Sequence, residues 1–379
     1  MQNTTQSSNF SILLGSYYFF YFALVGVYII FMPKVLLESG YSPFEVGIIY
    51  AAAPFMRFLL PFIFRYTIHL TAKVYFLSLI LTFLGSLLFL TAIKDFWLYL
   101  YANLLFGAAM GVSLPYVETI ALEKLSKSHY GKIRLWGSLG FMSIALWLGK
   151  ILSSPAEALY YLCTMAFLTL IFGAYLTKYD NTSHNTLHNN ASFSLLKYWA
   201  FWLSIFLMQV GFGGFYNFFT IYETSYGISL EMTSWMWSFG VICEIIMLYF
   251  QGPLLQRNLL NILQVATLFT AFRWLLLYLY PSSIMITFAS QSLHAVSFAL
   301  YHTAAITYVF SLYTQKKLAQ QFFLGIAFGL GGSVGAILSG QIYGKYLFLI
   351  EAIITFIAFL VLWIHQRRKV DITAKVDHV

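Results

Sequence analysis

Five ionisable residues stand within or beside long apolar stretches of the sequence: Glu118, Arg134, Glu244, Arg273 and His294. In hydrocarbon such side chains are costly and nearly always face a protein partner or a watery cavity. Glu118 and Arg134 flank a short basic turn, which predicts a charge pair between two consecutive helices. The alternative is that both charges extend to the lipid headgroups. Because the other three come from separate apolar segments, we expect a polar site between helices.

The composition indicates that a membrane surrounds these residues. Of 379 residues, 60% are hydrophobic and 9% charged, and apolar runs of about 20 residues recur along the chain. This excludes a soluble protein. The net charge of +8 is scattered over short loops, which sets membrane orientation and does not indicate a nucleic-acid site. Both cysteines, Cys163 and Cys243, fall inside apolar segments, so we expect no disulfide framework.

Twelve segments are long enough to span a bilayer. Their expected limits are 10–33, 43–64, 73–93, 96–121, 131–152, 157–177, 198–221, 231–252, 259–280, 283–311, 318–341 and 345–365. A polar stretch rich in Asn, Ser, Thr and His separates the sixth from the seventh. We predict an all-α membrane protein with two pseudo-symmetric six-helix halves, 1–177 and 198–379, a linker over 178–197 and a short C-terminal tail.

The Lys and Arg residues predict the orientation of these helices. With the N-terminus inside, fifteen of them fall on the inner side and four on the outer side. Positive residues concentrate on the cytoplasmic side of membrane proteins. We therefore expect a multi-pass protein of the cell membrane with both termini cytoplasmic.

Polar residues form a stripe along one face of each of five predicted helices. Successive residues of a helix are rotated by about 100° around its axis, so residues three or four positions apart lie on the same face. The stripes contain Asn103, Gly107, Gly111 and Glu118; Arg134, Ser138 and Phe141; Gln209, Gly213, Tyr216 and Thr220; Trp237, Gly240 and Glu244; and Gln291, His294, Phe298 and His302. A single stripe can be a satisfied interhelical hydrogen bond. Five together predict a lined cavity, with Asn103, Gln209, Tyr216 and Trp237 among its binding residues.

Several other features have simpler interpretations. The glycines from Gly325 to Gly340 lack the strand and the Lys-Ser/Thr of a phosphate loop, so we interpret them as close helix packing. The linker histidines lack a ligand cluster with zinc spacing, so we expect no metal site there. No ATP-binding motif is present, and we expect no cofactor. Arg57, between two prolines, either enters the cavity or extends to the headgroups.

Four runs carry a resemblance to a known family: YGKIRLWGSLGF, FGVICEII, FRW and QSLHAVSFALYH, in the fifth, eighth, ninth and tenth segments. They resemble the major facilitator superfamily, specifically its phenylpropionate permease-like branch, which is similar to the lactose permease-type oligosaccharide:proton symporters. The resemblance spans all twelve segments and implies a transporter. It implies substrate contacts for Glu118 and Arg134, and a stacking contact for Phe141 where that family has Trp.

The same resemblance implies proton coupling through Glu244, Arg273 and His294. Ser297 stands where lactose permease has its proton-carrying glutamate, so we expect Glu244 to carry the proton. Glu351 is set aside because it lies near the start of the last segment. The helix seven aspartates of that family have no counterpart here, and its Asp-Arg loop is reduced to RYTIHLTAK.

These observations predict a secondary transporter, a proton symporter for an organic or aromatic acid or for a glycoside or nucleoside. The expected partners are the solute, protons and the lipid bilayer, with the protein a monomer. Proton-driven efflux of amphipathic compounds is a second transporter hypothesis. A membrane acyltransferase that uses His294 or His302 as a base is the hypothesis from another class.

Overall fold

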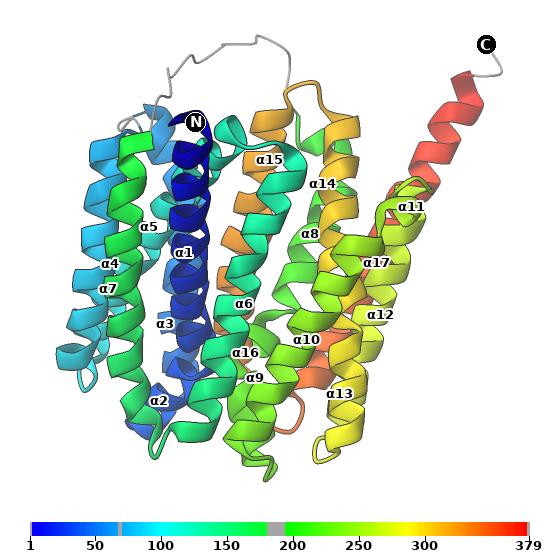
Figure 1. The fold of residues 1–379 in the computed structure, drawn as a ribbon. Helices are drawn as coiled ribbons and strands as arrows, with labels where there is room; N and C mark the ends of the chain where they lie inside the picture. The colour runs from blue at the N-terminus through cyan, green and yellow to red at the C-terminus, as the bar shows by residue number, and fades with distance from the viewer. Residues whose placement is uncertain (1, 67–69, 180–193, 377–379) are drawn as a thin grey trace. The chain divides into compact units, whose positions relative to one another are not determined.

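The structure is a computed structural model that describes residues 2–66, 70–179 and 194–376. Within these ranges the regular secondary structure is helical (Figure 1). The chain forms two compact units, 1–186 with 228–238 and 187–227 with 239–379. Most of the predicted linker, including His184 and His188, lies outside the described residues, as does part of the RYTIHLTAK loop. The predicted division into halves therefore stays a prediction.

The first unit contains six long helices with short helices at their ends. They are α1 (Gln2–Ile30), α2 (Met32–Glu38), α3 (Pro43–Tyr66), α4 (Ala72–Ala92), α5 (Phe96–Lys124), α6 (Lys127–Ile151), η1 (Pro155–Glu157), α7 (Ala158–Leu176) and η2 (Thr177–Tyr179). Side-chain caps fix three of the N-termini, since Thr71, Asp95 and Ser126 accept backbone N–H groups of α4, α5 and α6.

The second unit contains more, shorter elements. They are η3 (Leu196–Tyr198), α8 (Trp199–Val210), α9 (Gly213–Ser225), α10 (Leu230–Phe250, which begins in the first unit), α11 (Gly252–Leu255), α12 (Leu259–Leu279), α13 (Ile284–Ser292), η4 (Ala295–Leu300), α14 (Tyr301–Leu312), α15 (Lys316–Leu324), η5 (Gly325–Gly331), α16 (Gly332–Gln341) and α17 (Leu347–Val376).

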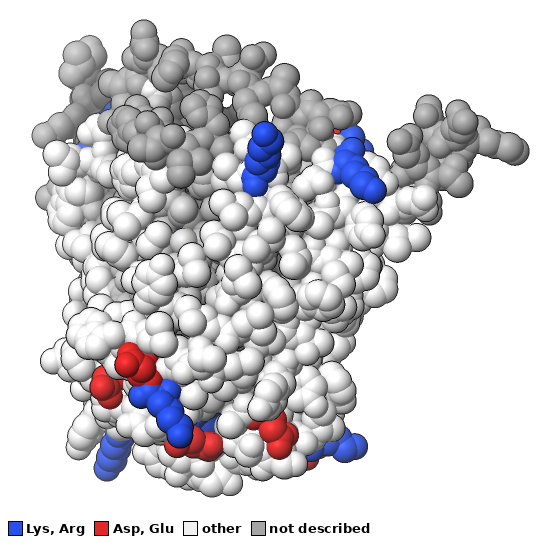
Figure 2. Space-filling model, turned by 90° about the vertical axis from the view of Figure 1, so that its left-hand side faces the viewer, with Lys and Arg blue, Asp and Glu red and all other residues white. Residues whose placement is uncertain are grey.

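The predicted all-α membrane fold is confirmed. In the part of the chain that the structure describes, eleven helical segments are long and apolar enough to cross a membrane. The twelfth is α6, whose 25 residues are also long enough but carry several Lys and Arg side chains. Figure 2 shows a wide uncharged band on one face, with charged side chains gathered toward its two ends. Such a band is what a lipid bilayer requires of a lipid-facing surface.

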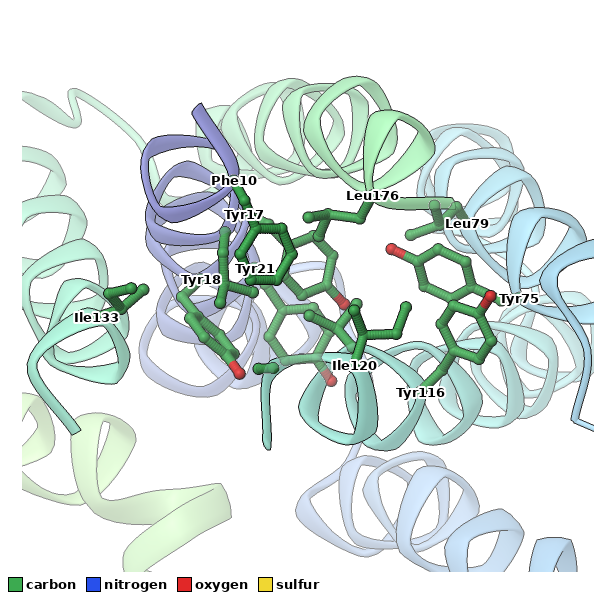
Figure 3. Close-up of a cluster of buried hydrophobic side chains, with 13 residues drawn as sticks. Phe10, Tyr17, Tyr18, Tyr21, Tyr75, Leu79, Tyr116, Ile120, Ile133 and Leu176 are labelled. Atoms are coloured by element: carbon green, nitrogen blue, oxygen red, sulfur yellow. The ribbon is translucent and has the colours of Figure 1, made fainter. Parts of the chain in front are cut away.

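Helices pack closely where glycines remove the side chains between them. In the first unit α1 lies along α6 and α7, and α3 lies along α5. A Cβ at Gly107 of α5 would collide with the backbone of Ala53 in α3, so the two backbones meet there without side chains between them. Figure 3 shows the aromatic core of this unit, where the Tyr75 and Tyr116 rings stack with centroids 4.2 Å apart.

Three of the predicted helices are interrupted in the second unit, which the sequence analysis did not foresee. The predicted segment 198–221 breaks at Gly211 and Phe212 between α8 and α9. The segments 283–311 and 318–341 contain the π-helical turns η4 and η5. Such turns are often found at functional sites. The predicted end at residue 221 was too early, because α9 continues to Ser225 and so includes Glu223.

Candidate functional site

The first unit brings Glu118 and Arg134 together, as their spacing predicts. The Arg134 Nε lies 3.4 Å from the Glu118 Oε1, joining α5 to α6. About a third of each side chain is exposed, at 33% and 30%. The pair is therefore accessible, and it offers both an acceptor and donors to a polar solute.

Aromatic rings hold the Arg134 guanidinium in place. Its Cζ lies 4.1 Å from the Phe22 ring centroid and 5.2 Å from that of Tyr18, both on α1. Such contacts stabilise a cation and orient its planar fork. Nothing in the sequence marks Phe22 or Tyr18 as site residues, because α1 contains no charged residue.

Asn103 forms hydrogen bonds to two neighbouring helices. Its Oδ1 accepts a hydrogen bond of 2.8 Å from the Tyr28 hydroxyl of α1, and its Nδ2 donates to the Ile49 carbonyl of α3. The side chain is fully buried. These bonds connect three helices of the first unit, which favours the interhelical alternative for this residue.

Phe141 and Trp237 are the aromatic candidates in the first unit. Their ring centroids lie 6.3 Å apart at an interplanar angle of 61°. Trp237 is buried and Phe141 is partly buried. Edge-to-face geometry of this kind is favourable for an aromatic pair and leaves ring faces that an aromatic or sugar ring could contact.

In the second unit Arg273 of α12 is fully buried, with 0% exposure. Its Nη2 donates to Gln291 Oε1 at 2.9 Å, and its Nη1 lies 3.2 Å from Ser297 Oγ and 3.0 Å from His294 Nδ1. The guanidinium also lies over two ring faces, 4.3 Å from the Phe215 centroid and 4.5 Å from that of its neighbour in the chain, Trp274.

The charge of Arg273 has no counter-ion at these contacts. None of the salt bridges among the described residues includes Arg273, and its Nε has no hydrogen-bond partner. A buried charge is normally paired, because the desolvation of an unpaired buried ion costs on the order of several kcal/mol. An anion would complete this site.

Glu244 of α10 lies within ion-pair distance of His294. The His294 Nε2 lies 3.7 Å from the Glu244 Oε2, while the other ring nitrogen of His294 faces Arg273. The Glu244 side chain is 21% exposed. The structure thus arranges the three residues of the predicted coupling site as a chain, with the imidazole in the middle.

A narrow pocket opens beside this chain in the second unit. It is walled by the end of α8, by η4 and α14, and by α15 and η5; its polar lining residues are Gln209, Ser297, Tyr301 and His302. Ser297 links the pocket to Arg273 by their hydrogen bond. The interior measures about 10 Å³, the space of about one water molecule. An organic solute therefore requires the surrounding helices to move apart.

Phe298 and His302, which line the pocket, belong to a row of stacked rings that begins at His294. The rings of His294, Phe298 and His302 stack in sequence, with centroids 5.2 Å and 6.1 Å apart. These residues were predicted to share a face, and they do so across the π-helical turn η4. Tyr216 lies outside this stack, with its ring 5.5 Å from that of Phe212 at the α8–α9 break.

The structure adds two buried acidic residues to Glu244 in the second unit. Glu351 of α17 is 1% exposed, although it lies near the start of its helix. Glu223 of α9 is fully buried beside the Thr287 hydroxyl. Position along a helix does not determine this burial, because burial depends on the neighbouring helices. Arg57, in contrast, is exposed.

Metal ligands do not gather in the parts of the chain that the structure describes. No group of three or more His, Cys, Asp or Glu side chains there is arranged to hold a metal ion. Both cysteines in the described residues are free thiols.

Comparisons with known proteins agree with this architecture. The chain is 23% identical over 344 residues to the "Probable 3-phenylpropionic acid transporter" of Escherichia coli (strain K12), covering 86% of this chain and 89% of the relative. It is 25% identical over 325 residues to the "Uncharacterized transporter YwbF" of Bacillus subtilis (strain 168), covering 82% and 80%.

The fold is also found in solved transporter structures. The crystal structure of the nucleoside transporter NupG superposes with a TM-score of 0.77 at 19% identity, covering 94% of this chain and 99% of that one. A model of the MFS_1 like family matches residues 11–358. The chain is therefore a multi-pass membrane protein that belongs to the MFS_1 like family, within the major facilitator superfamily of transporters.

Proposed function

We propose that this protein carries a small organic anion, best an aromatic carboxylate, across the membrane together with a proton. The observation that carries the proposal is the fully buried Arg273, which donates to the neutral side chains of Ser297 and Gln291 and whose Nε has no hydrogen-bond partner among the described residues. A guanidinium binds a carboxylate through two parallel hydrogen bonds. A carboxylate solute supplies both the missing charge and the missing acceptor.

The neighbouring aromatic side chains suit an aromatic acid. Phe215 and Trp274 lie against Arg273, and Phe298 and Phe328 line the adjacent pocket. One relative is named as a probable transporter of 3-phenylpropionic acid, which is an aromatic carboxylic acid. Its name and these contacts together support the choice of substrate class.

The proton part of the proposal rests on the chain Glu244, His294 and Arg273. The ion-pair distance between Glu244 and His294 is short enough that a proton on either group alters the charge facing Arg273. When a proton and an anion bind near one another, binding of either one raises the affinity for the other. Alternating access of two six-helix halves then moves both across the membrane.

A glycoside or nucleoside is the second candidate substrate. The observation in its favour is the accessible Glu118–Arg134 pair, which offers a carboxylate acceptor and guanidinium donors as a hydroxyl-rich solute requires. We further propose that the protein works as a monomer in the cell membrane with both termini cytoplasmic.

Solute exchange without a gradient separates these candidates. Purified protein in liposomes would be loaded with unlabelled solute and given trace labelled 3-phenylpropionate, uridine or a phenyl glycoside outside. We expect rapid exchange of the labelled acid only. Exchange of uridine or the glycoside, with none of the acid, would contradict the proposed substrate class. A chemically altered product would instead indicate the enzyme hypothesis.

A further inference from the structure

A carboxyl group from another helix lies directly at the break between α8 and α9. The Oε1 of Glu351 in α17 accepts the backbone N–H of Gly214, in the first turn of α9, and the Ser339 hydroxyl of α16 at 2.9 Å. Three elements of the second unit therefore meet at one carboxyl oxygen. Nothing in the proposed transport chain of Glu244, His294 and Arg273 uses this group.

The backbones around this carboxyl are in direct contact. A Cβ at Gly335 of α16 would lie 2.8 Å from the Val210 carbonyl oxygen at the end of α8, and one at Gly214 would lie 2.6 Å from the Glu351 Oε1. A side chain at Gly335 would collide with the α8 backbone, and one at Gly214 would displace the Glu351 carboxyl group. The Glu351 carboxyl group thus contacts the first turn of α9 directly, with no other side chain between them.

The second oxygen of this carboxyl is unsatisfied. The Glu351 Oε2 is buried and has no hydrogen-bond partner within the described residues, and the side chain as a whole is 1% exposed. Leaving a buried acceptor unpaired destabilises the protein, and more so when the acceptor is charged. Burial therefore favours a proton on this group.

Two other contacts favour the carboxylate instead. The Gly214 N–H and the Ser339 hydroxyl both donate to Oε1, and the N-terminal turn of a helix such as α9 attracts negative charge. The opposed effects of burial and donation allow the group to exist with and without its proton. A site that loads and releases a proton needs both states.

The ligand that fits is a proton and not a metal cation. The groups that reach the carboxyl from α9 and α16 are donors, whereas a metal cation needs several oxygen acceptors. The charged residues on packed neighbours, Arg273 on α12 and Glu223 on α9, form no hydrogen bond or ion pair with Glu351 among the described residues. Thr355 and Gly211, also adjacent, are uncharged.

We propose that Glu351 is a proton-binding site that latches the break between α8 and α9. As a carboxylate it holds Gly214 and Ser339 by charge-assisted hydrogen bonds. Protonation weakens those bonds and allows α9 to move relative to α8. Phe212, in the break itself, lines the narrow pocket, so movement there changes the size of the pocket. The latch is separate from the proposed transport site, and its test needs no solute.

Infrared spectroscopy tests whether Glu351 takes up a proton. Purified protein in nanodiscs would be titrated with acid while the C=O stretch of neutral carboxyl groups is recorded. We expect a titrating band that is absent in Glu351→Gln and retained in Glu123→Gln, a control at an exposed position of α5. Removing one donor in Ser339→Ala should move the midpoint up by about one pH unit. A titrating band of the same intensity in the parent and in Glu351→Gln would overturn the proposal.

A distance measurement tests whether the proton moves the break. Spin labels would be attached through Leu203→Cys in α8 and Ser225→Cys in α9, two exposed positions, after Cys163→Ser and Cys243→Ser. The labelled positions are roughly 30 Å apart along a helical path, a span suited to pulsed electron resonance. We expect pH to shift the distance distribution in the parent and Glu351→Gln to hold the low-pH distribution throughout. Parent-like pH dependence in Glu351→Gln would refute the latch.

These outcomes are independent of the proposed transport function. If the parent protein shows no proton-driven uptake but Glu351 does titrate, only the transport proposal is contradicted. If the parent protein shows proton-driven uptake but Glu351 does not titrate, only the latch is contradicted.

Discussion

Replacing Arg273 tests the anion site most specifically. In the structure this guanidinium makes three side-chain contacts of 2.9–3.2 Å and leaves its Nε free. A bound carboxylate would add charge-assisted hydrogen bonds, each about 1.5–3 kcal/mol. If desolvation of the carboxylate and the guanidinium offsets about half of the gain from two such hydrogen bonds, about 2 kcal/mol of binding free energy remains. The acid should then bind about 30-fold more tightly than its neutral amide.

The assay compares 3-phenylpropionate with 3-phenylpropionamide by isothermal titration of the purified protein. Arg273→Gln should abolish the preference for the acid, and Arg273→Lys should retain only part of it, because an ammonium group cannot reproduce two parallel hydrogen bonds. Arg257→Gln, at an exposed position of the same unit, is the matched control and should keep the full preference.

Loss of stability does not confuse this comparison. Arg273→Gln leaves the Gln291 acceptor without its donor, which costs about 1–3 kcal/mol of stability. An unfolded fraction lowers the apparent binding of acid and amide equally, so their ratio reports only the site. A ratio near 30 in Arg273→Gln would refute the assignment of Arg273 to the substrate anion.

Three further predictions concern charge and orientation. Arg134→Lys should weaken binding of the substrate about tenfold or more, because the planar donor facing Glu118 is lost; calorimetry showing parental affinity would contradict a role in binding. Glu244→Gln should still exchange labelled solute across liposomes but lose uphill accumulation, and accumulation at the parental level would exclude it as the coupling residue. Cysteines replacing Lys94 and Lys345, both exposed, should react with an impermeant thiol reagent added to intact cells, whereas labelling of Lys178→Cys under the same conditions would reverse the orientation.

The membrane segments could be predicted from the sequence because a bilayer imposes their length and apolar composition. Segment limits at 43–64 and 259–280 differ by at most two residues from α3 and α12. The Glu118–Arg134 contact was also predictable, since both residues flank one short turn. In both cases the signal is local in the sequence.

Features that depend on distant elements could not be predicted in this way. The partners of Arg273 come from α13 and η4, and the hydropathy pattern of α12 gives no sign of them. The burial of Glu351 depends on the glycine backbones of α9 and α16. The α8–α9 break has no proline, but Gly211, Gly213 and Gly214 mark it in the sequence. The packing around Gly213 and Gly335 involves distant elements and is seen only in the structure.

Uphill accumulation in sealed liposomes tests the central claim most directly. Purified protein would be reconstituted with an imposed proton gradient, acidic outside, and labelled 3-phenylpropionate at equal concentration on both sides. Permeation of the neutral acid through lipid alone would be subtracted with protein-free liposomes and with Arg273→Gln. We expect accumulation of unaltered acid above both controls, abolished by a protonophore. Equal accumulation in the parent, Arg273→Gln and protein-free liposomes would contradict proton-coupled transport of an organic acid by this protein.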